Sequence, residues 1–531
     1  MTVAGYTTDL QTLDDFEGST TDSEFTGYTA TSKPDDSDTD FPIQGNAHVS
    51  SEQRTSALGS IAIDNGSNIT WTTGWSFFLW GIFLAPAAVN TDANGGIVMM
   101  VGSATSAYYK WTVGGSDFGR YPYGGWQNFV CDPEVTNGRT TTGSPGTNYR
   151  WCGMGCDVVS AIAKGSPYGV DAIRYGRGEL KIINGESGAY GTFEGMSNTN
   201  DNNSNMWGLF QENSGSYLWK GLISLGTATA VDFRDSNRAI FIDNTRRVAS
   251  GFNRIEINHS SSNVEWTNIN ITALGTQSKG EFEMIDDAVV KMDTCVFTDM
   301  STFIFLSNVT LTGTTFRRCG QVTQGGGTFT DCIFDNSVPS VSILVDDLSL
   351  ITGSTFKSDG SNHAVNLGTI GATGSVTWAN YLEDYETYAS GGTSTGNEAI
   401  LVSVSSGFTL TVNVSSGYDT PSFYNTGLGT VLVVNSVTVS VYVKDKDNAA
   451  VEGASVAVYK SSDDAEIMNE LSATTTGLAT ESFAYATDTN VYIRVRKSST
   501  GTRYIPVLTT GTITSTGLTL TIVLNEDGIV T

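Results

Sequence analysis

The fold is decided between residues 290 and 356, where four stretches ending in phenylalanine align without gaps over eight positions. They read Val290-Lys-Met-Asp-Thr-Cys-Val-Phe297, Val309-Thr-Leu-Thr-Gly-Thr-Thr-Phe316, Gly327-Thr-Phe-Thr-Asp-Cys-Ile-Phe334 and Ser349-Leu-Ile-Thr-Gly-Ser-Thr-Phe356. Successive phenylalanines are 19, 18 and 22 residues apart. A near-constant period of this size indicates stacked structural repeats.

Two further columns of this alignment are also uniform in character. Two residues before each phenylalanine the side chain is small, and five residues before it the side chain is large and apolar: Cys295, Thr314, Cys332 and Ser354 form the first column, and Met292, Leu311, Phe329 and Ile351 the second. In a parallel β-helix each coil lies about 4.8 Å above the last, so equivalent side chains point into one interior and form ladders. A leucine-rich repeat has a similar period but needs a leucine and asparagine pattern that these stretches lack.

The same geometry makes a prediction about the cysteines. Cys295 and Cys332 share a column but have the coil of Thr314 between them, which separates them by about 9 to 10 Å. That gap is too wide for a disulfide. We therefore expect free thiols in this part of the chain.

The whole chain is expected to be all-β, with a right-handed parallel β-helix flanked by an N-terminal jelly-roll-like β-sandwich and a C-terminal immunoglobulin-like β-sandwich. Its 531 residues suggest about three domains, which we place at 1–185, 186–435 and 436–531. The 59 glycines and the low charged content of 16 % favour short strands joined by turns. Less regular coils are expected around Val231 and Val264, and the last ones around Ile400 and Phe408.

The flanking regions carry their own strand patterns. Residues 1–185 contain short aromatic or β-branched runs bounded by turn residues, among them Trp75-Ser-Phe-Phe-Leu-Trp80. With Leu13-Asp-Asp-Phe-Glu17, this arrangement resembles a lectin-type jelly roll. From Val437 to Val443 valine alternates with polar residues, which predicts a half-buried antiparallel strand. This strand, the turn at 445–448 and Val451-Glu-Gly-Ala-Ser-Val456 resemble immunoglobulin-like modules of the carboxypeptidase regulatory type, which usually act as spacers or sticky tips.

Charge and export signals restrict the partners and the location. A formal net charge of −27 repels phosphate backbones and anionic membrane surfaces, so neither nucleic acid binding nor membrane insertion is expected. The first residues lack the basic start and apolar stretch of a secretory signal, so we expect synthesis and assembly in a cytoplasm. The six cysteines, Cys131, Cys152, Cys156, Cys295, Cys319 and Cys332, are too sparse for a disulfide scaffold.

Catalytic and metal-binding motifs are weak. His48, His259 and His363 are far apart in the sequence and are interpreted as surface or turn residues rather than members of a triad. Cys152 and Cys156 lack the further ligands of a zinc site, and the oxygen-rich turns at 35–40 and 445–448 lack calcium-site spacing. No cofactor or metal is therefore expected. The aromatic run 121–126 could stack on sugar rings, but corner packing is the favoured interpretation.

Carboxylates form the remaining group of candidates, because β-helices often cleave polysaccharides with paired acidic side chains. The candidates on or beside the coils are Asp286, Asp287, Asp293, Asp331, Asp335, Glu383, Asp384 and Glu386. Spacing selects no pair among them, and in an acidic protein most such residues are solvated. The sequence therefore assigns no catalytic residue.

Taken together, residues 75–79 and 121–130, the coils from Phe297 to Phe356 and the final alternating module resemble virion proteins of tailed bacteriophages, namely fibres, tailspikes and capsid appendages. The resemblance implies a virion location, contacts with other virion proteins, a homo-oligomer with a trimer favoured, and attachment to a host-surface glycan. It leads to the expectation of a non-enzymatic structural component. The alternatives are a tailspike-type polysaccharide depolymerase, hydrolase or lyase, and a bacterial adhesin, which the missing export signal disfavours.

Overall fold

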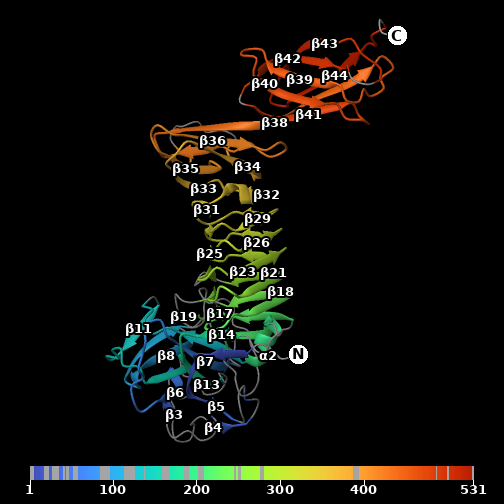
Figure 1. The fold of residues 1–531 in the computed structure, drawn as a ribbon. Helices are drawn as coiled ribbons and strands as arrows, with labels where there is room; N and C mark the ends of the chain where they lie inside the picture. The colour runs from blue at the N-terminus through green and yellow to red at the C-terminus, as the bar shows by residue number, and fades with distance from the viewer. Residues whose placement is uncertain are drawn as a thin grey trace. The chain divides into compact units, whose positions relative to one another are not determined.

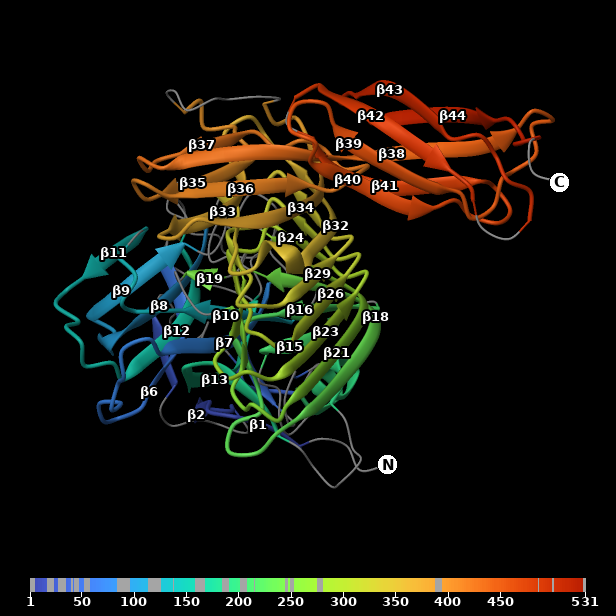
Figure 2. The same cartoon turned by 45° about the horizontal axis from the view of Figure 1, so that its top comes forward.

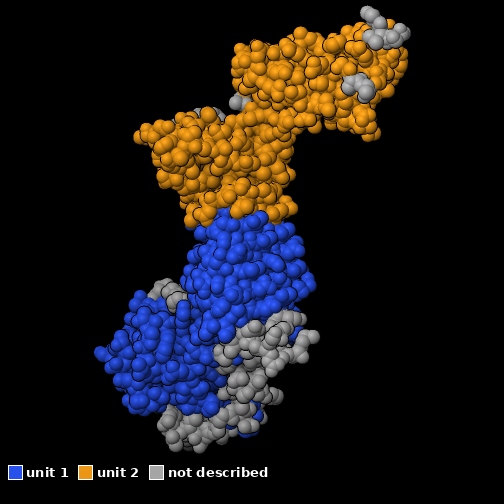
Figure 3. Space-filling model, in the orientation of Figure 1, with its two compact units in different colours: residues 1–328, 335–339 blue, residues 329–334, 340–531 orange. Residues whose placement is uncertain are grey.

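The computed structural model describes most of the chain and divides it into two compact units (Figure 3). The described residues are 5–16, 23–26, 35–39, 42, 47–51, 58–83, 96–112, 126–136, 138–157, 168–183, 191–200, 208–213, 215–243, 247–248, 253–274, 280–386, 394–485, 487–498 and 501–528. The first unit comprises residues 1–328 with 335–339, and the second comprises 329–334 with 340–531.

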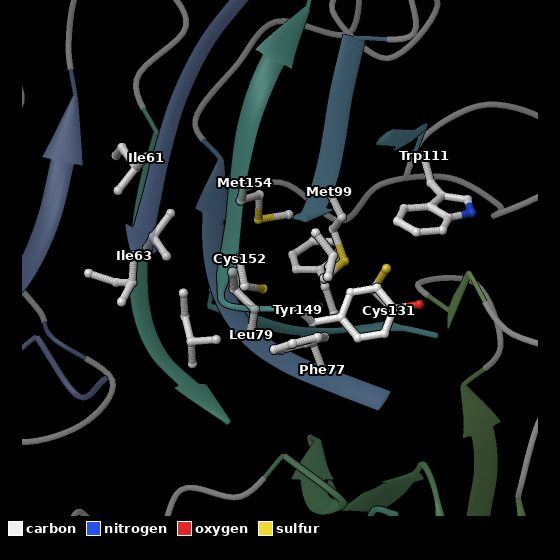
Figure 4. Close-up of a cluster of buried hydrophobic side chains, with 14 of the residues drawn as sticks. Ile61, Ile63, Phe77, Leu79, Met99, Trp111, Cys131, Tyr149, Cys152 and Met154 are labelled. Atoms are coloured by element: carbon white, nitrogen blue, oxygen red, sulfur yellow. The ribbon is translucent and has the colours of Figure 1, made fainter. Parts of the chain in front are cut away.

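Two sheets made of antiparallel strand pairs, with one parallel pair between β10 and β19, share one apolar core at the start of the first unit. One sheet contains β3 (Ser23–Thr26), β6 (Leu58–Asp64), β8 (Gly96–Ala104), β9 (Ala107–Thr112), β11 (Arg139–Thr142) and β12 (Trp151–Asp157). The other contains β2 (Gln11–Asp14), β4 (Asp35–Asp38), β5 (His48–Ser51), β7 (Ser76–Phe83), β10 (Gln127–Cys131), β13 (Tyr168–Gly176) and β19 (Arg247–Val248). Figure 4 shows Phe77 and Leu79 of β7 packed near Met99, Cys152 and Met154 of the first sheet.

The rest of the first unit consists mainly of stacked coils, whose strands pair in parallel with the coils before and after them (Figures 1 and 2), except that β15 pairs antiparallel with β16. One sheet runs through β14 (Glu179–Ile183), β17 (Leu222–Leu225), β20 (Arg254–Ile257), β22 (Glu281–Met284), β25 (Thr302–Ile304) and β28 (Val322–Thr323), and β1 (Gly5–Thr8) pairs antiparallel with β14. The second contains β15 (Phe210–Asn213), β16 (Ser216–Trp219), β18 (Asp232–Asp243), β21 (Asn263–Leu274), β23 (Val289–Asp293), β24 (Val296–Thr298), β26 (Val309–Thr312) and β27 (Thr315–Arg317).

The interior of these coils has the ladders expected from the sequence. Met292 lies opposite Leu311, and both side chains are buried. Phe297 lies opposite Phe316, with ring centroids 5.5 Å apart in a stacked arrangement. Burial of these large side chains in successive coils is the main apolar contribution to the stability of the stack.

The coils turn between strands at a corner where one residue adopts a left-handed backbone conformation. The residues at this corner are Asn237, Asn268, Thr294 and Gly313 in the first unit, and Asp331 and Gly353 in the second. Asn, Asp and Gly are the residues that tolerate positive φ best. The Asn268 side-chain amide also donates a 2.8 Å hydrogen bond to Asn237 Oδ1, so one corner supports the next.

The second unit also contains parallel coil strands and ends in a further module. Its coil strands are β29 (Thr328–Thr330), β30 (Ile333–Asp335), β31 (Val341–Leu344), β32 (Ile351–Lys357), β33 (His363–Ile370), β34 (Gly374–Glu383), β35 (Ile400–Val404), β36 (Thr409–Val414) and β37 (Phe423–Asn425). Phe329 lies opposite Ile351, and the buried rings of Phe334 and Phe356 stack with centroids 4.8 Å apart. The short helix η1 (Leu348–Leu350) leads into β32.

One long strand joins the last coil to the C-terminal module. β38 (Thr430–Asp445) pairs in parallel with β36 through Thr430–Asn435, and its later residues pair antiparallel with β41 (Leu478–Tyr485) and parallel with β44 (Leu518–Leu524). Val437, Val439, Val441 and Val443 are all buried, as their alternation predicts. A second sheet contains β40 (Glu466–Leu471), β39 (Ser455–Lys460), β42 (Thr489–Arg496) and β43 (Val507–Ile513), and both sheets contribute to one core.

The all-β class and the stacked parallel sheets of a β-helix are therefore confirmed. The division into three domains stays a prediction. One short α-helix, α2 (Phe193–Asn200), occurs among the described residues, and none of the helices there is long and apolar enough to span a bilayer. The described cysteines Cys131, Cys152, Cys295, Cys319 and Cys332 are buried and free, as expected for Cys295 and Cys332.

Candidate active site

A group of carboxylates lies on the outer face of two neighbouring coil strands in the first unit. β20 reads Arg254-Ile-Glu-Ile257 and β22 reads Glu281-Phe-Glu-Met284, paired in parallel so that Arg254 lies opposite Glu281 and Glu256 opposite Glu283. The four apolar residues are buried in the coil interior. Because side chains alternate along a strand, the four charged residues all point outward.

Arg254 bridges the three carboxylates. Its Nη1 lies 3.3 Å from Glu256 Oε1 and 2.5 Å from Glu283 Oε2, while its Nη2 lies 2.6 Å from Glu281 Oε2. Since both first contacts share one nitrogen, the Glu256 and Glu283 oxygens lie at most 5.8 Å apart, the sum of the two distances. Retaining glycosidases hold their two carboxyl groups about 5 to 5.5 Å apart, and inverting enzymes about 6.5 to 9.5 Å.

The two facing glutamates have different surroundings. The Glu256 side chain is 9 % exposed and has a second cation, Arg177, at 3.6 Å, whereas the Glu283 side chain is 24 % exposed and contacts Arg254. Partial burial lowers the pKa of Arg254, but its hydrogen bond to Glu281 and the charges of the three glutamates outweigh this effect, so its pKa is raised. The guanidinium group therefore stays charged and holds the carboxylates in place.

Polar residues extend this group of charged side chains onto the two preceding strands of the sheet, β17 and β14. Ser224 of β17 lies opposite Glu256, and Lys181 of β14 lies opposite Ser224. Ser224 donates a 2.6 Å hydrogen bond to Glu179 Oε1, and Lys181 lies 3.4 Å from Glu179 Oε2. A row of polar and charged groups thus crosses four parallel strands, at about 4.8 Å per step.

The acidic residues singled out from the sequence do not converge on one site. Asp287 accepts hydrogen bonds from the Ser307 hydroxyl and the Asn308 backbone, which makes it part of a turn. Asp335 pairs with Arg317 at 2.9 Å. Asp286, Asp293 and Asp331 are exposed, and Asp331 occupies a left-handed corner position.

The second predicted acidic stretch, residues 381–386, lies at the end of β34. Glu383 pairs with Lys357 at 3.1 Å, and the backbone carbonyl of Asp384 accepts a hydrogen bond from the Asn397 amide. The Glu386 N–H donates to the Asn397 carbonyl at 3.2 Å. Burial raises the pKa of Tyr385, which lies between these acids. These contacts attach residues 383–386 to Lys357 and Asn397. None of them brings two of the predicted carboxylates together.

The histidines differ from the sequence-based interpretation. His48 and His363 are buried, at 4 % and 7 % exposure, so assigning them to the surface was wrong. His363 Nδ1 lies 2.7 Å from the backbone oxygen of Glu398 and 3.7 Å from its Oε2. Burial opposes ionisation of Glu398, but hydrogen bonds from Thr395 and Ser394 lower its pKa overall. The Ser394 hydroxyl donates a 2.9 Å hydrogen bond to Glu398 Oε2 and not to the His363 ring, so these three residues do not have the order of a catalytic triad.

The other predicted features have structural roles where they are described. The Asp445 carboxylate accepts hydrogen bonds from the Asp447 and Ala449 backbone, which closes a turn. Trp126 packs edge-on against His48, with ring centroids 5.1 Å apart, while residues 121–125 lie outside the described residues. The Cys156 side chain and Asp40 lie outside them as well. Across the described ranges, no three His, Cys, Asp or Glu residues form a group that could hold a metal ion.

Sequence reasoning missed Arg254, Glu256, Glu281 and Glu283. A signal was present, because Arg-Ile-Glu-Ile and Glu-Phe-Glu-Met share one alternating pattern. Their separation of 27 residues, however, exceeds the period of 18 to 22 that defined the repeats. The intervening coil is longer, so the alignment that revealed the interior columns did not extend to this pair.

Comparison with known proteins finds no family and only weakly similar solved structures. No family model matches the chain, and no curated protein matches it. Among solved structures, the catalytic domain of GH87 alpha-1,3-glucanase in complex with nigerose is 9 % identical with a TM-score of 0.16, covering 80 % of this chain and 95 % of that one. A variant of that catalytic domain with tetrasaccharides is 10 % identical with a TM-score of 0.15, covering 83 % of this chain and 89 % of that one.

These neighbours bear on one earlier expectation. The solved structures found are catalytic domains of a glycoside hydrolase, which goes against the expectation of a non-enzymatic chain, and that expectation is not retained. The likeness is too low to transfer a substrate or a catalytic residue. Any assignment of chemistry to this chain therefore has to come from its own side chains.

Proposed function

We propose that the chain is a polysaccharide-cleaving protein of the retaining glycoside hydrolase type, with Glu256 and Glu283 as the catalytic pair. The observation that carries the proposal is their separation, with oxygens at most 5.8 Å apart around Arg254 Nη1. This upper limit is compatible with the separation in retaining enzymes and is shorter than the separation of about 6.5 to 9.5 Å in inverting enzymes, which place a water between the two carboxyl groups.

The different surroundings of the two glutamates indicate which one is the nucleophile and which one is the acid. Glu256 contacts two guanidinium groups and Glu283 contacts one, so Glu256 is the glutamate that the surroundings favour more strongly as a carboxylate, and we assign it as the nucleophile and Glu283 as the acid. Glu256 attacks the anomeric carbon and forms a glycosyl ester, while the bond to the leaving sugar breaks and that sugar's oxygen takes a proton from Glu283. Glu283, now a carboxylate, then removes a proton from water, which attacks the ester and releases the sugar and the Glu256 carboxylate. The greater exposure of Glu283 suits the group that must meet both leaving group and water.

The biological setting is part of the same proposal. We propose that the chain is a tailspike-type depolymerase on the virion of a tailed bacteriophage, in contact with other virion proteins and as a homo-oligomer, with a trimer favoured, and the resemblance of the sequence to such virion proteins supports this setting. In this setting the N-terminal sandwich is a lectin-type jelly roll and the C-terminal module is immunoglobulin-like. Two sheets that share one core in each region support these assignments.

The test is to incubate the purified chain with a panel of bacterial capsular and surface polysaccharides and to measure new reducing ends. A hydrolase produces reducing ends without unsaturated sugars, whereas a lyase also produces ultraviolet-absorbing unsaturated ends. Glu265→Gln is the matched control, because Glu265 also points outward and contacts two cations, Lys291 and Arg234. Cleavage that persists in both Glu256→Gln and Glu283→Gln would show the proposed pair to be wrong.

A further inference from the structure

A groove of about 400 Å³ lies on the outer face of the sheet β40-β39-β42-β43 in the C-terminal module. Its floor is formed by two small residues of the central strand β39, Ser455 and Ala457. Ala457 has Asn469 on one side and Arg494 on the other, and Ser455 lies opposite Arg496. Small side chains between longer ones leave a trough on an otherwise flat sheet, which explains the hollow.

The rim of the groove is cationic in an acidic chain. Arg494 and Arg496 alternate with buried residues on β42, so both point to the outer face, and both are exposed. Among the described residues, neither guanidinium group has a hydrogen bond or an ion pair with a carboxylate. Within the described part of the module, their donors are therefore available for an anionic ligand.

Aromatic rings hold one of these arginines in position. The Arg494 Cζ lies 5.7 Å from the centre of the Tyr459 ring and 5.2 Å from that of Tyr492, and the two rings stack 5.3 Å apart. Contact with ring faces orients a guanidinium group without neutralising it. The tyrosine hydroxyls bond to Glu466 and Asp464, which keeps those two acids occupied.

We propose that this groove binds a carboxylate-bearing saccharide unit, with its carboxylate on Arg494 and Arg496. Planar guanidinium groups match carboxylates in geometry and charge. Asn469 and Ser455 offer hydrogen-bonding groups for sugar hydroxyls, and Leu508 and Pro506 offer an apolar wall. Such a mixture of an apolar surface and a few convergent polar groups is typical of small-ligand sites.

The proposal goes beyond the catalytic pair, since it concerns a different module and a binding step rather than cleavage. It predicts that the chain holds acidic glycans through the C-terminal module whether or not the glutamates of the first unit cleave them. The two proposals can therefore fail separately.

The experiment measures binding by titration calorimetry with the full chain carrying Glu256→Gln and Glu283→Gln, so that no probe is cleaved. The probes are trigalacturonate, a hyaluronan tetrasaccharide and disialic acid, with fully methyl-esterified trigalacturonate and triglutamate as controls. At least one acidic oligosaccharide is expected to bind. Arg494→Gln and Arg496→Gln should each weaken that binding about tenfold or more, because each removes a charge-assisted hydrogen bond.

Arg503→Gln is the matched control, since Arg503 is an exposed arginine of the same module that does not line the groove. Its binding should equal that of the parent chain. The proposal is overturned if none of the three acidic oligosaccharides binds, if the methyl ester binds as well as the acid, or if all three arginine variants lose affinity equally. Equal or tighter binding of triglutamate would also overturn it, in favour of an acidic peptide.

Discussion

Glu256 and Glu283 face each other across adjacent parallel strands and contact the same guanidinium nitrogen, Arg254 Nη1, at 3.3 and 2.5 Å. The chain segments that carry them are 27 residues apart and are brought together by one turn of the β-helix. The surface of the stacked coils therefore carries two carboxylates at a spacing that suits the hydrolysis of glycosidic bonds.

The first prediction concerns the stereochemistry of cleavage. If Glu256 forms a covalent intermediate, the first product released has the same anomeric configuration as the substrate. Proton NMR of the anomeric signals, recorded in the first minutes on a polysaccharide that the chain cleaves, measures this directly. Glu283→Gln and Glu256→Gln should each lower the rate at least about a hundredfold, as expected for loss of an acid or a nucleophile. Products with inverted configuration would rule out the assigned roles.

The second prediction concerns the phenylalanine ladder. Phe316 is fully buried, and its ring centre lies 5.5 Å from that of Phe297 and 4.8 Å from that of Phe303. Phe316→Ala should lower the free energy of unfolding by about 3 to 5 kcal/mol, because it leaves a cavity in a packed interior. Guanidinium denaturation followed by tryptophan fluorescence checks this value. Ile285→Ala, at a residue 51 % exposed, should cost much less, and equal losses would argue against a packed ladder.

The third prediction concerns pH. Arg150 Nε and Nη2 donate hydrogen bonds of 2.6 and 2.7 Å to the Asp64 carboxylate, and these bonds lower the pKa of Asp64. A lowered folded-state pKa means that the stabilisation is fully present above the unfolded-state pKa of aspartate, and is lost as the pH falls through the folded-state value.

Asp64→Asn should therefore destabilise the protein by about 0.5 to 1 kcal/mol at neutral pH, a modest value because the pair is partly solvated. The difference from the parent chain should shrink as the pH falls below the unfolded-state pKa of aspartate and through the lowered folded-state pKa of Asp64. Denaturation curves at several pH values measure it. A difference that stays constant across this range would show that the ion pair is not its source.

The fourth prediction concerns the left-handed corner in the second unit. Gly353 has φ of +66°, and a Cβ added there would lie 2.1 Å from Asp331 Oδ1. Gly353→Ala should cost about 1 to 2 kcal/mol for the backbone alone, with a steric term in addition. Gly360→Ala isolates the backbone cost, because Gly360 also has positive φ but no atom within 4 Å of the added Cβ. The double variant Asp331→Gly with Gly353→Ala should recover the steric part, because glycine removes the Asp331 carboxylate and also tolerates the positive φ of residue 331, and the recovery is measured as a rise in melting temperature.

The interior of the β-helix could be predicted because its chemistry repeats along the chain. Met292 and Leu311, or Phe329 and Ile351, occupy equivalent positions in successive coils, so stacking imposes the same requirement for an apolar side chain at a fixed offset. The alternating valines of β38 could be predicted for the same reason, since one face of the strand is buried and the other is not.

The candidate site could not be predicted in this way, because outward-facing residues have no such requirement. Asp335 and Glu383 were reasonable candidates by composition, yet each contacts a cation on a neighbouring coil. The sequence suggested that His363 is a surface or turn residue. In the structure it is buried and contacts Glu398, which lies 35 positions later in the chain. Burial of a polar group depends on which distant segment covers it.

The sequence by itself determined the all-β class, the coil repeat and the positions of the interior ladders, because these follow from the local periodicity of apolar side chains. Only the tertiary structure decided which charged residues meet. The number of residues per coil varies, so the register that places Glu256 against Glu283, or Arg494 beside Ala457, is set by strand pairing and not by spacing along the chain. Surface chemistry in a β-helix arises from contacts between coils, and those contacts exist only once the coils are stacked.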